Sequence, residues 1–538
     1  MTSHANPQAG TDQTRLNNQD PSDIPYFRHL GPLAAAKYAF TMSAALFEAE
    51  RKGLTQGKFA APCTFQMFTR SLPYTGIGDE RSSFMISAGL LPIAEWLQGW
   101  RFTKKDLEVL AEERTPGGEP LYSREFLHFL SRDRLQVSID AMPDGELAFP
   151  REPMLRVSGP FYQCVMLEDM ILNIKNSCTD FATLAAQAVI AADGRPVYEF
   201  GTRRAQDIGG LAPAYAAYIA GFSGTSNYLA RKHMGIPAFG TMAHALVMLA
   251  EDEMDAFASW AQGMPGLGIF LVDTYDTLDG VRNAIETCRT HGVALNGIRL
   301  DSGDLAYLSK EARKLMDEAG FPGAKIFAGN DLNPSKIDNL LRVQQAPIDV
   351  PVIGTWLASA SANPALGGVY KLACMLDELG IPYNKMKFSQ DTGKSTLPGA
   401  LDVVRTIGPD GLFSGDIITR LDDGLGADRL TSDVTSINPD DPLRDKAFPA
   451  GTQIHRPLQP FWRPEIGVVS DYTNLEVARK RAADNLARLD PTHRRLMNQH
   501  RYVAGVEQHL YGEFTGTIRA NSLRHTRPQQ RPQQQLAL

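Results

Sequence analysis

The sequence predicts an α/β protein: an irregular (β/α) barrel with parallel strands, plus a second α/β domain formed from the N- and C-terminal flanks. Short apolar runs recur roughly 25 to 30 residues apart through the middle of the chain, about one βα unit each. Stretches with helical spacing lie between them. Buried parallel strands read as continuous apolar runs, so this rhythm indicates a parallel sheet, open or closed into a barrel.

Four of these runs are the clearest strand candidates, and each ends in polar or glycine residues. The predicted strands are 269–272, 297–300, 325–327 and 350–353, and the predicted helices between them include 278–288 and 309–319. In α/β folds, ligands bind at the carboxyl edge of the strands. The polar residues that follow the runs are therefore candidate site residues.

The segments before and after the predicted barrel lack the regular spacing of apolar runs. We interpret them as one domain that the barrel interrupts. In the C-terminal flank, apolar residues recur at helical spacing from Leu475 to Leu489, and residues 501–503 are predicted to form a closing strand. Both ends of the chain are polar or low in complexity, which is typical of disorder. The predicted divisions are tails at 1–24 and 516–538, a flanking domain at 25–150 and 385–515, and the barrel at 151–384.

Composition narrows the class of protein. The chain has 538 residues, 43% of them hydrophobic, and a net charge of −7, so it lacks the basic surplus of a nucleic-acid-binding protein. Its five cysteines form no CxxC pair, which favours a reducing compartment. No apolar run is long enough to span a bilayer and no signal segment is present. A soluble cytoplasmic protein is expected, with no nucleic-acid or membrane partner.

Three common catalytic motifs are excluded by spacing. Residues 393–395 resemble the end of a P-loop, but Phe388 stands where its first glycine is needed. Gly221, Ser223 and Gly224 are wrongly spaced for a nucleophile elbow. No paired-cysteine or HExxH pattern holds a metal. A catalytic metal would therefore arrive with a phosphate substrate.

Three segments that end predicted strands have the chemistry of an anion site. Residues 200–205 contain paired arginines, residues 224–227 form a hydroxyl-rich glycine turn, and residues 240–244 end in a histidine. Glycine lets backbone amides approach an anion, and arginine binds a carboxylate or phosphate through a two-pronged fork. Histidine can change protonation or carry a phosphoryl group.

Taken in order, the motifs resemble those of the nicotinate phosphoribosyltransferase family. The resemblance runs from about Lys37 to Val503, through residues 38–42, 65–70, 200–205, 224–227, 240–244, 273–277, 299–304, 354–355, 367–371 and 394–399. It implies transfer of phosphoribose from phosphoribosyl pyrophosphate (PRPP) to nicotinate, giving nicotinate mononucleotide and pyrophosphate in NAD salvage. It also implies ATP as co-substrate, Mg²⁺, and a ligase-type reaction driven by hydrolysis of a phosphohistidine.

The resemblance also assigns residues. As catalytic residues it implies His244 (the phosphohistidine), Arg299 and Asp301, with Mg²⁺ near Asp301 and Asp304. For the nicotinate site it implies Tyr38, Phe200, Arg203, Arg204, Thr241 and Arg299. For PRPP and its phosphates it implies Gly224, Thr225, Ser226, Asn330, Gly354 and Thr355. Tyr38 would come from a neighbouring subunit, so a homodimer with shared active sites is expected.

Each assignment has a structural alternative. Asp301 and Asp304, like Asp273 and Asp276, can instead cap the helices that follow them. Arg203 and Arg204 can be a surface ion-pair site, and Tyr38 can belong to the core. Ala245 follows the histidine where the family commonly has serine or glutamate, which bears on the tightness of ATP coupling. The open functional alternatives are a nicotinamide-using or quinolinate-using relative, and a catalytically silent nucleotide-binding barrel.

Overall fold

The computed structural model describes residues 29–78, 80–207, 209–389, 394–439, 441–469 and 474–526, without the side chains of 442 and 521–526. The predicted tail at 1–24 lies outside this part of the chain, as do residues 527–538. The described residues form three large sheets, one two-stranded sheet and the helices that join them.

A six-stranded parallel sheet follows the predicted rhythm. Its strands are β6 (Tyr198–Glu199), β7 (Gly224–Thr225), β8 (Ile269–Leu271), β9 (Gly297–Leu300), β10 (Lys325–Ala328) and β11 (Val350–Ile353). Their order is β7-β6-β11-β10-β9-β8, and every neighbouring pair is parallel. The four predicted strands are confirmed as β8 to β11. Over the described residues β7 and β8 are the two ends, so the sheet is an open half-barrel and a closed barrel is not confirmed.

Helices connect these strands. They are α7 (Leu211–Ala220), α8 (Tyr228–Met234), α9 (His244–Leu249), α10 (Glu253–Gly263), α11 (Thr277–His291), α12 (Leu305–Glu318), α13 (Pro334–Asp338) and α14 (Thr355–Ala358). A single 3-10 turn, η5 (Thr202–Arg204), follows β6, and a π-helical turn, η6 (Asn339–Val343), extends α13. The predicted helices 278–288 and 309–319 are confirmed as α11 and α12. Their side-chain caps are Asp276 and Asp304.

A seven-stranded sheet joins distant segments of the chain. Its strands are β1 (Pro62–Thr69), β3 (Ser138–Ala141), β5 (Leu155–Pro160), β12 (Gly368–Leu376), β13 (Pro382–Asn384), β19 (Gln459–Arg463) and β20 (Gly467–Val468). The order is β13-β12-β1-β5-β3-β19-β20, with antiparallel pairing. Strands β5, β12 and β13 come from the segment predicted to be the barrel, so sheet membership runs across the predicted domain boundaries. The division into domains stays a prediction.

The third sheet is built from the C-terminal flank. Its strands are β14 (Leu401–Ile407), β15 (Phe413–Arg420), β16 (Val434–Ile437), β17 (Lys446–Phe448), β18 (Gln453–His455) and β21 (Ala504–Glu507), in the order β17-β16-β21-β15-β14-β18. The closing strand predicted at 501–503 thus begins at Ala504. Helix α16 (Gln508–Thr526) follows, so the tail predicted from residue 516 is helical up to Thr526. Two short strands, β2 (Met85–Ile86) and β4 (Leu147–Ala148), pair separately.

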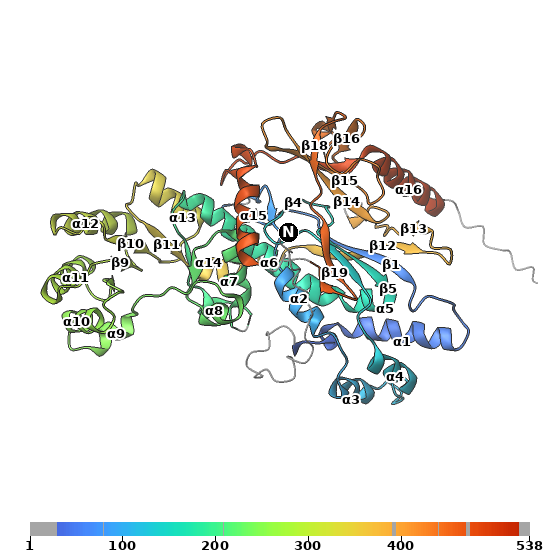
Figure 1. Cartoon of the computed structure of the whole chain (residues 1–538), viewed down its shortest axis with the longest axis horizontal. Coiled ribbons are helices and arrows are strands. Elements are labelled where there is room, and N and C mark those ends of the chain that lie inside the picture. The colour runs from blue at the N-terminus through green and yellow to red at the C-terminus, as the bar shows by residue number, and fades with distance from the viewer. Residues whose placement is uncertain are drawn as a thin grey trace, which may run out of the picture.

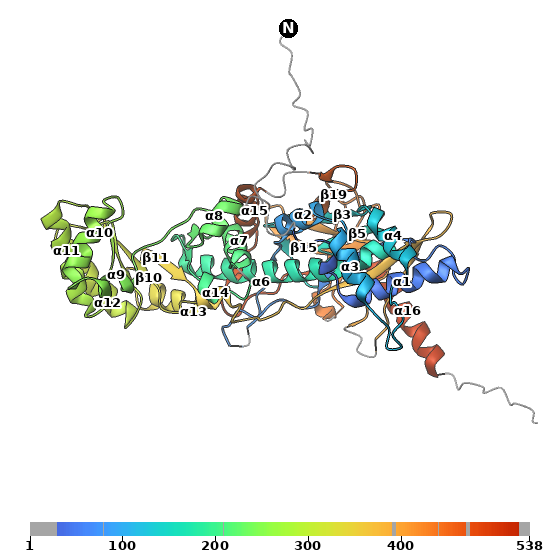
Figure 2. The same cartoon turned by 90° about the horizontal axis from the view of Figure 1, so that it is seen from below.

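The remaining helices pack around these sheets. They are α1 (Lys37–Arg51), α2 (Leu90–Gln98), α3 (Lys104–Glu112), α4 (Arg124–Arg132), α5 (Phe161–Met166), α6 (Glu168–Ala192) and α15 (Leu475–Ala487). Helix α6 is buried on most of its faces and lies between the parallel sheet at one end and the other sheets (Figures 1 and 2). Many of its buried residues belong to the largest core cluster.

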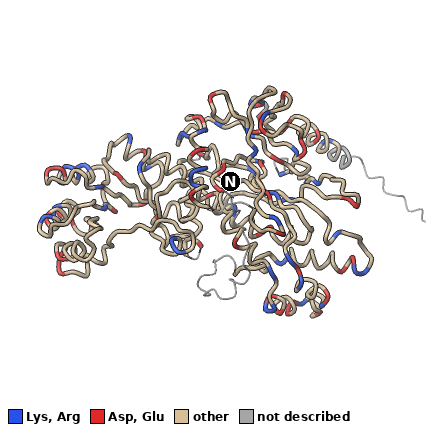
Figure 3. Tube along the Cα trace, in the orientation of Figure 1, with Lys and Arg blue, Asp and Glu red and all other residues tan. Residues whose placement is uncertain are grey.

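Charged residues of both signs are spread along the described part of the chain. Lys and Arg are interspersed with Asp and Glu along the trace (Figure 3). Among the described residues, no helix has both the length and the apolar character needed to cross a membrane.

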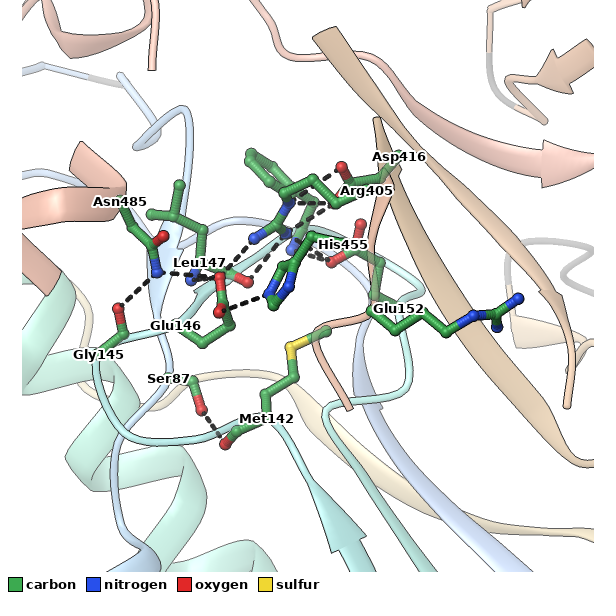
Figure 4. Close-up of polar contacts among 12 residues, drawn as sticks. Ser87, Met142, Gly145, Glu146, Leu147, Glu152, Arg405, Asp416, His455 and Asn485 are labelled. Carbon is green, nitrogen blue, oxygen red and sulfur yellow. Dashed lines mark hydrogen bonds and ion pairs between the residues drawn. The ribbon is translucent and has the colours of Figure 1, made fainter. Parts of the chain in front are cut away.

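A buried charged cluster joins the C-terminal sheet to the loop around β4 (Figure 4). The fully buried Arg405 on β14 contacts Glu146, Asp416 and Glu152. His455 and Asn485 complete the contacts of Glu146. Because buried ions are costly without partners, this cluster needs all of its members in place.

Candidate active site

The loops after the six parallel strands form one edge of the sheet, and most predicted site residues lie there. Phe200 follows β6, Ser226 follows β7, and Asp273 follows β8. Asp301 follows β9, Asn330 follows β10, and Gly354 follows β11. Since all six strands are parallel, these loops meet at the same edge.

Arg299 lies near the end of β9, the strand next to the end strand β8, and contacts several of the predicted site residues. Its Nη1 donates to Thr241 Oγ1 at 3.1 Å, and its Nη2 lies 3.1 Å from Asp301 Oδ1. The guanidinium carbon is 5.5 Å from the centroid of the Phe200 ring. The side chain is 16% exposed, and among the described residues its Nε has no hydrogen-bond partner. The sequence predicted these four residues for one site, and the structure brings them together.

An aromatic wall stands beside the guanidinium. The Phe239 ring lies 4.5 Å from Tyr198, 6.2 Å from Phe200 and 5.4 Å from Phe327, centroid to centroid. Phe200 and Phe239 are half-buried and pack on apolar residues of the strands. Phe239 was not predicted. Its signal in the sequence was an aromatic residue placed directly before the Gly-Thr of residues 240–241.

His244 begins α9 and faces the loop that follows β8. Its Nδ1 lies 3.0 Å from Thr274 Oγ1, and its Nε2 lies 3.9 Å from Asp273 Oδ1. The other oxygen of Asp273 accepts from the Asp301 amide at 2.8 Å and from Ser302 Oγ at 2.7 Å. Among the described residues, Asp273 Oδ1 is buried without a hydrogen bond. Asp273 therefore links the histidine to the loop that carries Asp301.

The structure separates the two aspartates that follow β9. Asp304 caps α12 and accepts from the amides of Ala306 at 3.1 Å and Tyr307 at 3.0 Å, so the cap alternative is confirmed for this residue. Asp301 instead faces Arg299. A Cβ on Gly329 would lie 2.2 Å from Asp301 Oδ1, so the carboxylate occupies space that only glycine leaves open.

The glycine turn after β7 has a partly structural role. Thr225 is fully buried, and its hydroxyl donates to Glu199 Oε2 at 2.5 Å. A Cβ on Gly224 would lie 2.4 Å from the Pro237 carbonyl oxygen. Burial raises the pKa of Glu199 above its usual value. The polar groups of Thr225 are thus used within the fold, whereas the neighbouring Ser226 is half-buried.

Four further predicted residues, Arg203, Arg204, Asn330 and Thr355, lie at the edge, and all but the half-buried Thr355 are exposed. Arg203 and Arg204 on η5 are exposed, and their guanidinium groups form no ion pair with the described residues, so the surface ion-pair alternative is not observed. Thr355 begins α14 directly after Gly354. Asn330 has a φ of 72°, a left-handed conformation that asparagine adopts more readily than most residues.

Tyr38 is not part of this edge in a single chain. It lies on α1, at the opposite end of the molecule from β8–β10 in both views (Figures 1 and 2). The side chain is 46% exposed, so the core alternative is wrong. Its hydroxyl donates to Glu168 Oε2 at 2.9 Å. Burial and the Glu168 carboxylate raise the pKa of Tyr38 above its usual value.

The fold and this edge define an α/β protein whose parallel sheet carries, at the carboxyl edge of its strands, a guanidinium beside an aromatic wall and a histidine–aspartate pair. Models of one protein family match most of the chain. The nicotinate phosphoribosyltransferase N-terminal domain matches residues 33–176, the family model matches 196–344, and the C-terminal domain matches 402–512. The chain therefore belongs to the nicotinate phosphoribosyltransferase family.

Individual relatives agree with the family models. The nicotinate phosphoribosyltransferase of Bacillus subtilis is 41% identical over 364 residues, which cover 67% of this chain and 71% of the relative. The Mycobacterium tuberculosis enzyme pncB2 is 37% identical over 406 residues, covering 75% and 81%. Human nicotinic acid phosphoribosyltransferase shares the fold, with a TM-score of 0.73, 24% identity and coverage of 90% of this chain and 99% of that chain.

Proposed function

We propose that this chain transfers phosphoribose from PRPP to nicotinate, giving nicotinate mononucleotide and pyrophosphate. The observation that carries the proposal is the placement of Arg299 between Thr241, Asp301 and the Phe200 ring, in a chain of this family. A guanidinium beside an aromatic face suits a flat pyridine ring with a carboxylate.

In the proposed reaction, the pyridine nitrogen forms a bond to C1 of the ribose while the bond from C1 to pyrophosphate breaks. The leaving group takes the electron pair. Positive charge develops on the ribose, so a nearby carboxylate is stabilising, and Asp301 is placed for this. Gly354, Thr355 and Ser226 would hold the 5-phosphate, and Arg203 and Arg204 would bind the anionic groups.

Magnesium would enter with PRPP and neutralise the departing pyrophosphate. The residues fit this use: Asp301 supplies a half-exposed carboxylate, and Asn330 supplies a side-chain amide at the next strand end. Asp304 is less suited, because one of its oxygens accepts two amides of α12.

ATP coupling through His244 is the second part of the proposal. A phosphoryl group would move from ATP to a ring nitrogen of His244, and water would later release it as phosphate. Asp273, 3.9 Å from Nε2, would orient the ring, and the hydroxyl of Thr274 supports Nδ1. Ala245, the residue after the histidine, has only a methyl side chain and so adds no hydrogen bond to His244.

The site is proposed to be completed by a second copy of the chain. Tyr38 is exposed on α1, at the end of the molecule away from the parallel sheet. A homodimer that sets α1 of one subunit against the strand edge of the other would add this phenol to the nicotinate slot. Cross-linking between residue 38 and the 200–204 loop of the partner would test this arrangement.

Product formation from nicotinate and PRPP with magnesium, with and without ATP, is the test. Turnover that ATP stimulates, and that Arg299→Gln reduces by about two orders of magnitude, is the expected result. Loss of ATP stimulation in His244→Ala, with residual turnover retained, would place the phosphohistidine there. Arg313→Gln, a helix arginine paired with Asp317, is the matched control.

Parallel assays with nicotinamide and quinolinate separate the alternatives. Nicotinamide lacks the carboxylate that Arg299 would bind, so its kcat/KM is expected to be lower by at least about tenfold. Quinolinate turnover with carbon dioxide release would instead support the quinolinate-using relative. No turnover with any of the three rings would refute the enzymatic reading in favour of a silent nucleotide-binding protein.

A further inference from the structure

Two carboxylates of α6 hold the start of α1, where Tyr38 lies. The Tyr38 hydroxyl donates to Glu168 Oε2 at 2.9 Å. The backbone amide of Ala36, two residues earlier, donates to Asp169 Oδ2, also at 2.9 Å. Both acids lie in the first turn of α6, more than a hundred residues away in the sequence. Neighbouring carboxylates of one helix therefore fix the backbone and a side chain at the start of another.

The contact made by Asp169 serves the fold. Ala36 is the N-cap residue of α1, and its methyl side chain accepts no hydrogen bond from the helix amides. A carboxylate beside a helix N-terminus is favourable, because it complements the unpaired amides and the helix dipole. Asp169 thus stabilises the start of α1. Glu168 binds a side-chain hydroxyl instead, so its contact fixes the position of the Tyr38 ring rather than the helix.

Glu168 is itself held in place by Lys371 on β12. The Glu168 side chain is 18% exposed, and its Oε1 lies 3.4 Å from Lys371 Nζ. The same ammonium group donates to the carbonyl of the buried Tyr370 at 2.8 Å. One carboxylate oxygen of Glu168 is therefore paired with a cation, and the other accepts from the phenol. A carboxylate fixed in this way restricts the ring more than a mobile surface side chain would.

The ring of Tyr38 is left open although its hydroxyl is held. Tyrosine usually packs its ring in the protein and leaves its hydroxyl in water. Here the hydroxyl is bound to Glu168, while the residue as a whole stays 46% exposed. Met42, four residues later and thus on the same face of α1, is 37% exposed. Within the described part of one chain this apolar face is uncovered, which suits contact with a second copy.

We propose that Glu168, held by Lys371, is a positioning residue for the nicotinate slot of the partner subunit. It fixes the Tyr38 ring in the orientation that the strand edge of a second copy receives. This inference rests on the proposed function, because Tyr38 reaches a nicotinate slot only in the proposed dimer. A ring that is already ordered loses less conformational freedom when nicotinate binds. Without Glu168, the ring would become ordered only on binding, and nicotinate would bind more weakly.

Steady-state kinetics of the full chain with nicotinate and PRPP test the coupling between Glu168 and Tyr38. Glu168→Leu and Tyr38→Phe should each raise the KM for nicotinate by about three- to tenfold with kcat unchanged, because a side chain must then be ordered on binding. The double variant should be no worse than the worse single variant, since both changes remove the same contact. Glu125→Leu, which removes a partner of Arg51 on the same helix, is the matched control and should leave the KM unchanged. Multiplied effects in the double variant, or an unchanged KM in either single variant, would overturn the proposal.

Mixed dimers, purified with a different tag on each subunit, separate an effect on the partner's site from an effect within one subunit. In the first dimer, one subunit carries Arg299→Gln and the other carries Glu168→Leu. The intact Arg299 then lies opposite an intact Glu168, so the KM for nicotinate should equal that of the wild type. In the second dimer, one subunit carries both changes and the other carries none. The intact Arg299 then lies opposite the altered residue 168, so the KM should be raised as in Glu168→Leu.

The outcomes of this comparison separate the inference from the proposed function. A raised KM in the first dimer, a wild-type KM in the second, or a protein from which no dimer can be isolated would overturn the role of Glu168. The transfer reaction would still stand in each of these cases, provided that the wild type turns over nicotinate. Absence of wild-type turnover would refute the proposed function, and this inference with it.

Discussion

Replacement of Arg405 by methionine tests what the buried cluster contributes to stability (Figure 4). Methionine is close in length, so the change removes the charge and donors with little loss of volume. Arg405 Nη1 donates to Glu146 Oε1 at 2.6 Å, and its Nε and Nη2 bind Asp416 at 3.0 and 2.7 Å. Its Nη2 also lies 4.0 Å from Glu152 Oε2. The variant therefore leaves three buried carboxylates without their guanidinium.

The expected cost follows from these contacts. Breaking a buried ion pair by removing one partner costs about 3–5 kcal/mol, because the remaining charge stays buried. That is a large share of a typical free energy of unfolding of about 5–15 kcal/mol. Hydrogen exchange of the β14 and β15 amides should then be faster by about two to four orders of magnitude. Arg282→Met, which breaks an exposed pair with Asp279, should change stability by less than about 0.5 kcal/mol.

The loss of stability in the Arg405→Met variant should also depend on pH. Burial and the Asp416 charge already raise the pKa of Glu152 well above its usual value. Although burial opposes it, the contacts with His455 and Arg405 hold the pKa of Glu146 below its usual value. Without Arg405 the pKa of Glu146 rises, so this carboxylate becomes protonated, and no longer a buried charge, as the pH falls. The loss in free energy of unfolding relative to the wild type should therefore shrink from about pH 8 to about pH 5. A deficit below about 1 kcal/mol, or one independent of pH, would refute this reasoning.

Three more variants give separate tests. Burial raises the pKa of Asp180 from 3.8 to about 7, so wild-type stability should fall as pH rises from about 4 to about 7, and the urea midpoint of Asp180→Asn should lack that slope. Gly329→Ala places a Cβ 2.2 Å from Asp301 Oδ1 and should lower kcat/KM for nicotinate about tenfold or more, whereas Gly323→Ala, with open space around its Cβ, should not. Asp273→Asn should reduce ATP stimulation more than ATP-independent turnover; an equal loss in both would contradict its role at the histidine.

Strands β8 to β11 of the parallel sheet were predictable because each is a continuous apolar run, which is a local signal in the sequence. Residues 269–272 and 297–300 are continuous apolar runs, and they became β8 and β9 with nearly the same bounds. Strands β6 and β7 are only two residues long and show no such run. They form because β6 pairs with β11, which is more than a hundred residues away in the sequence. Pairing at that range has no local signal.

The antiparallel sheets were not predictable for the same reason. Strand β1 lies between β5 and β12, with Phe65 opposite Val157 on one side and Leu372 on the other. Partners so far apart in the chain meet only because of the tertiary fold. The sequence therefore indicated that the flanks associate, through apolar patterns such as that of α15, without indicating which strands pair.

The aspartates at the strand edge show where the chemistry of a motif is ambiguous and how the structure removes the ambiguity. After both β8 and β9, two aspartates stand three residues apart, and either could cap the following helix. In both cases the second aspartate is the N-cap: Asp276 caps α11 and Asp304 caps α12. The first aspartate of each pair, Asp273 or Asp301, does not cap the helix and lies at the sheet edge. These two residues are in contact there, because Asp273 accepts a hydrogen bond from the Asp301 amide. A carboxylate directly after a parallel strand, with a second one already serving the helix, is therefore the stronger candidate for a functional group.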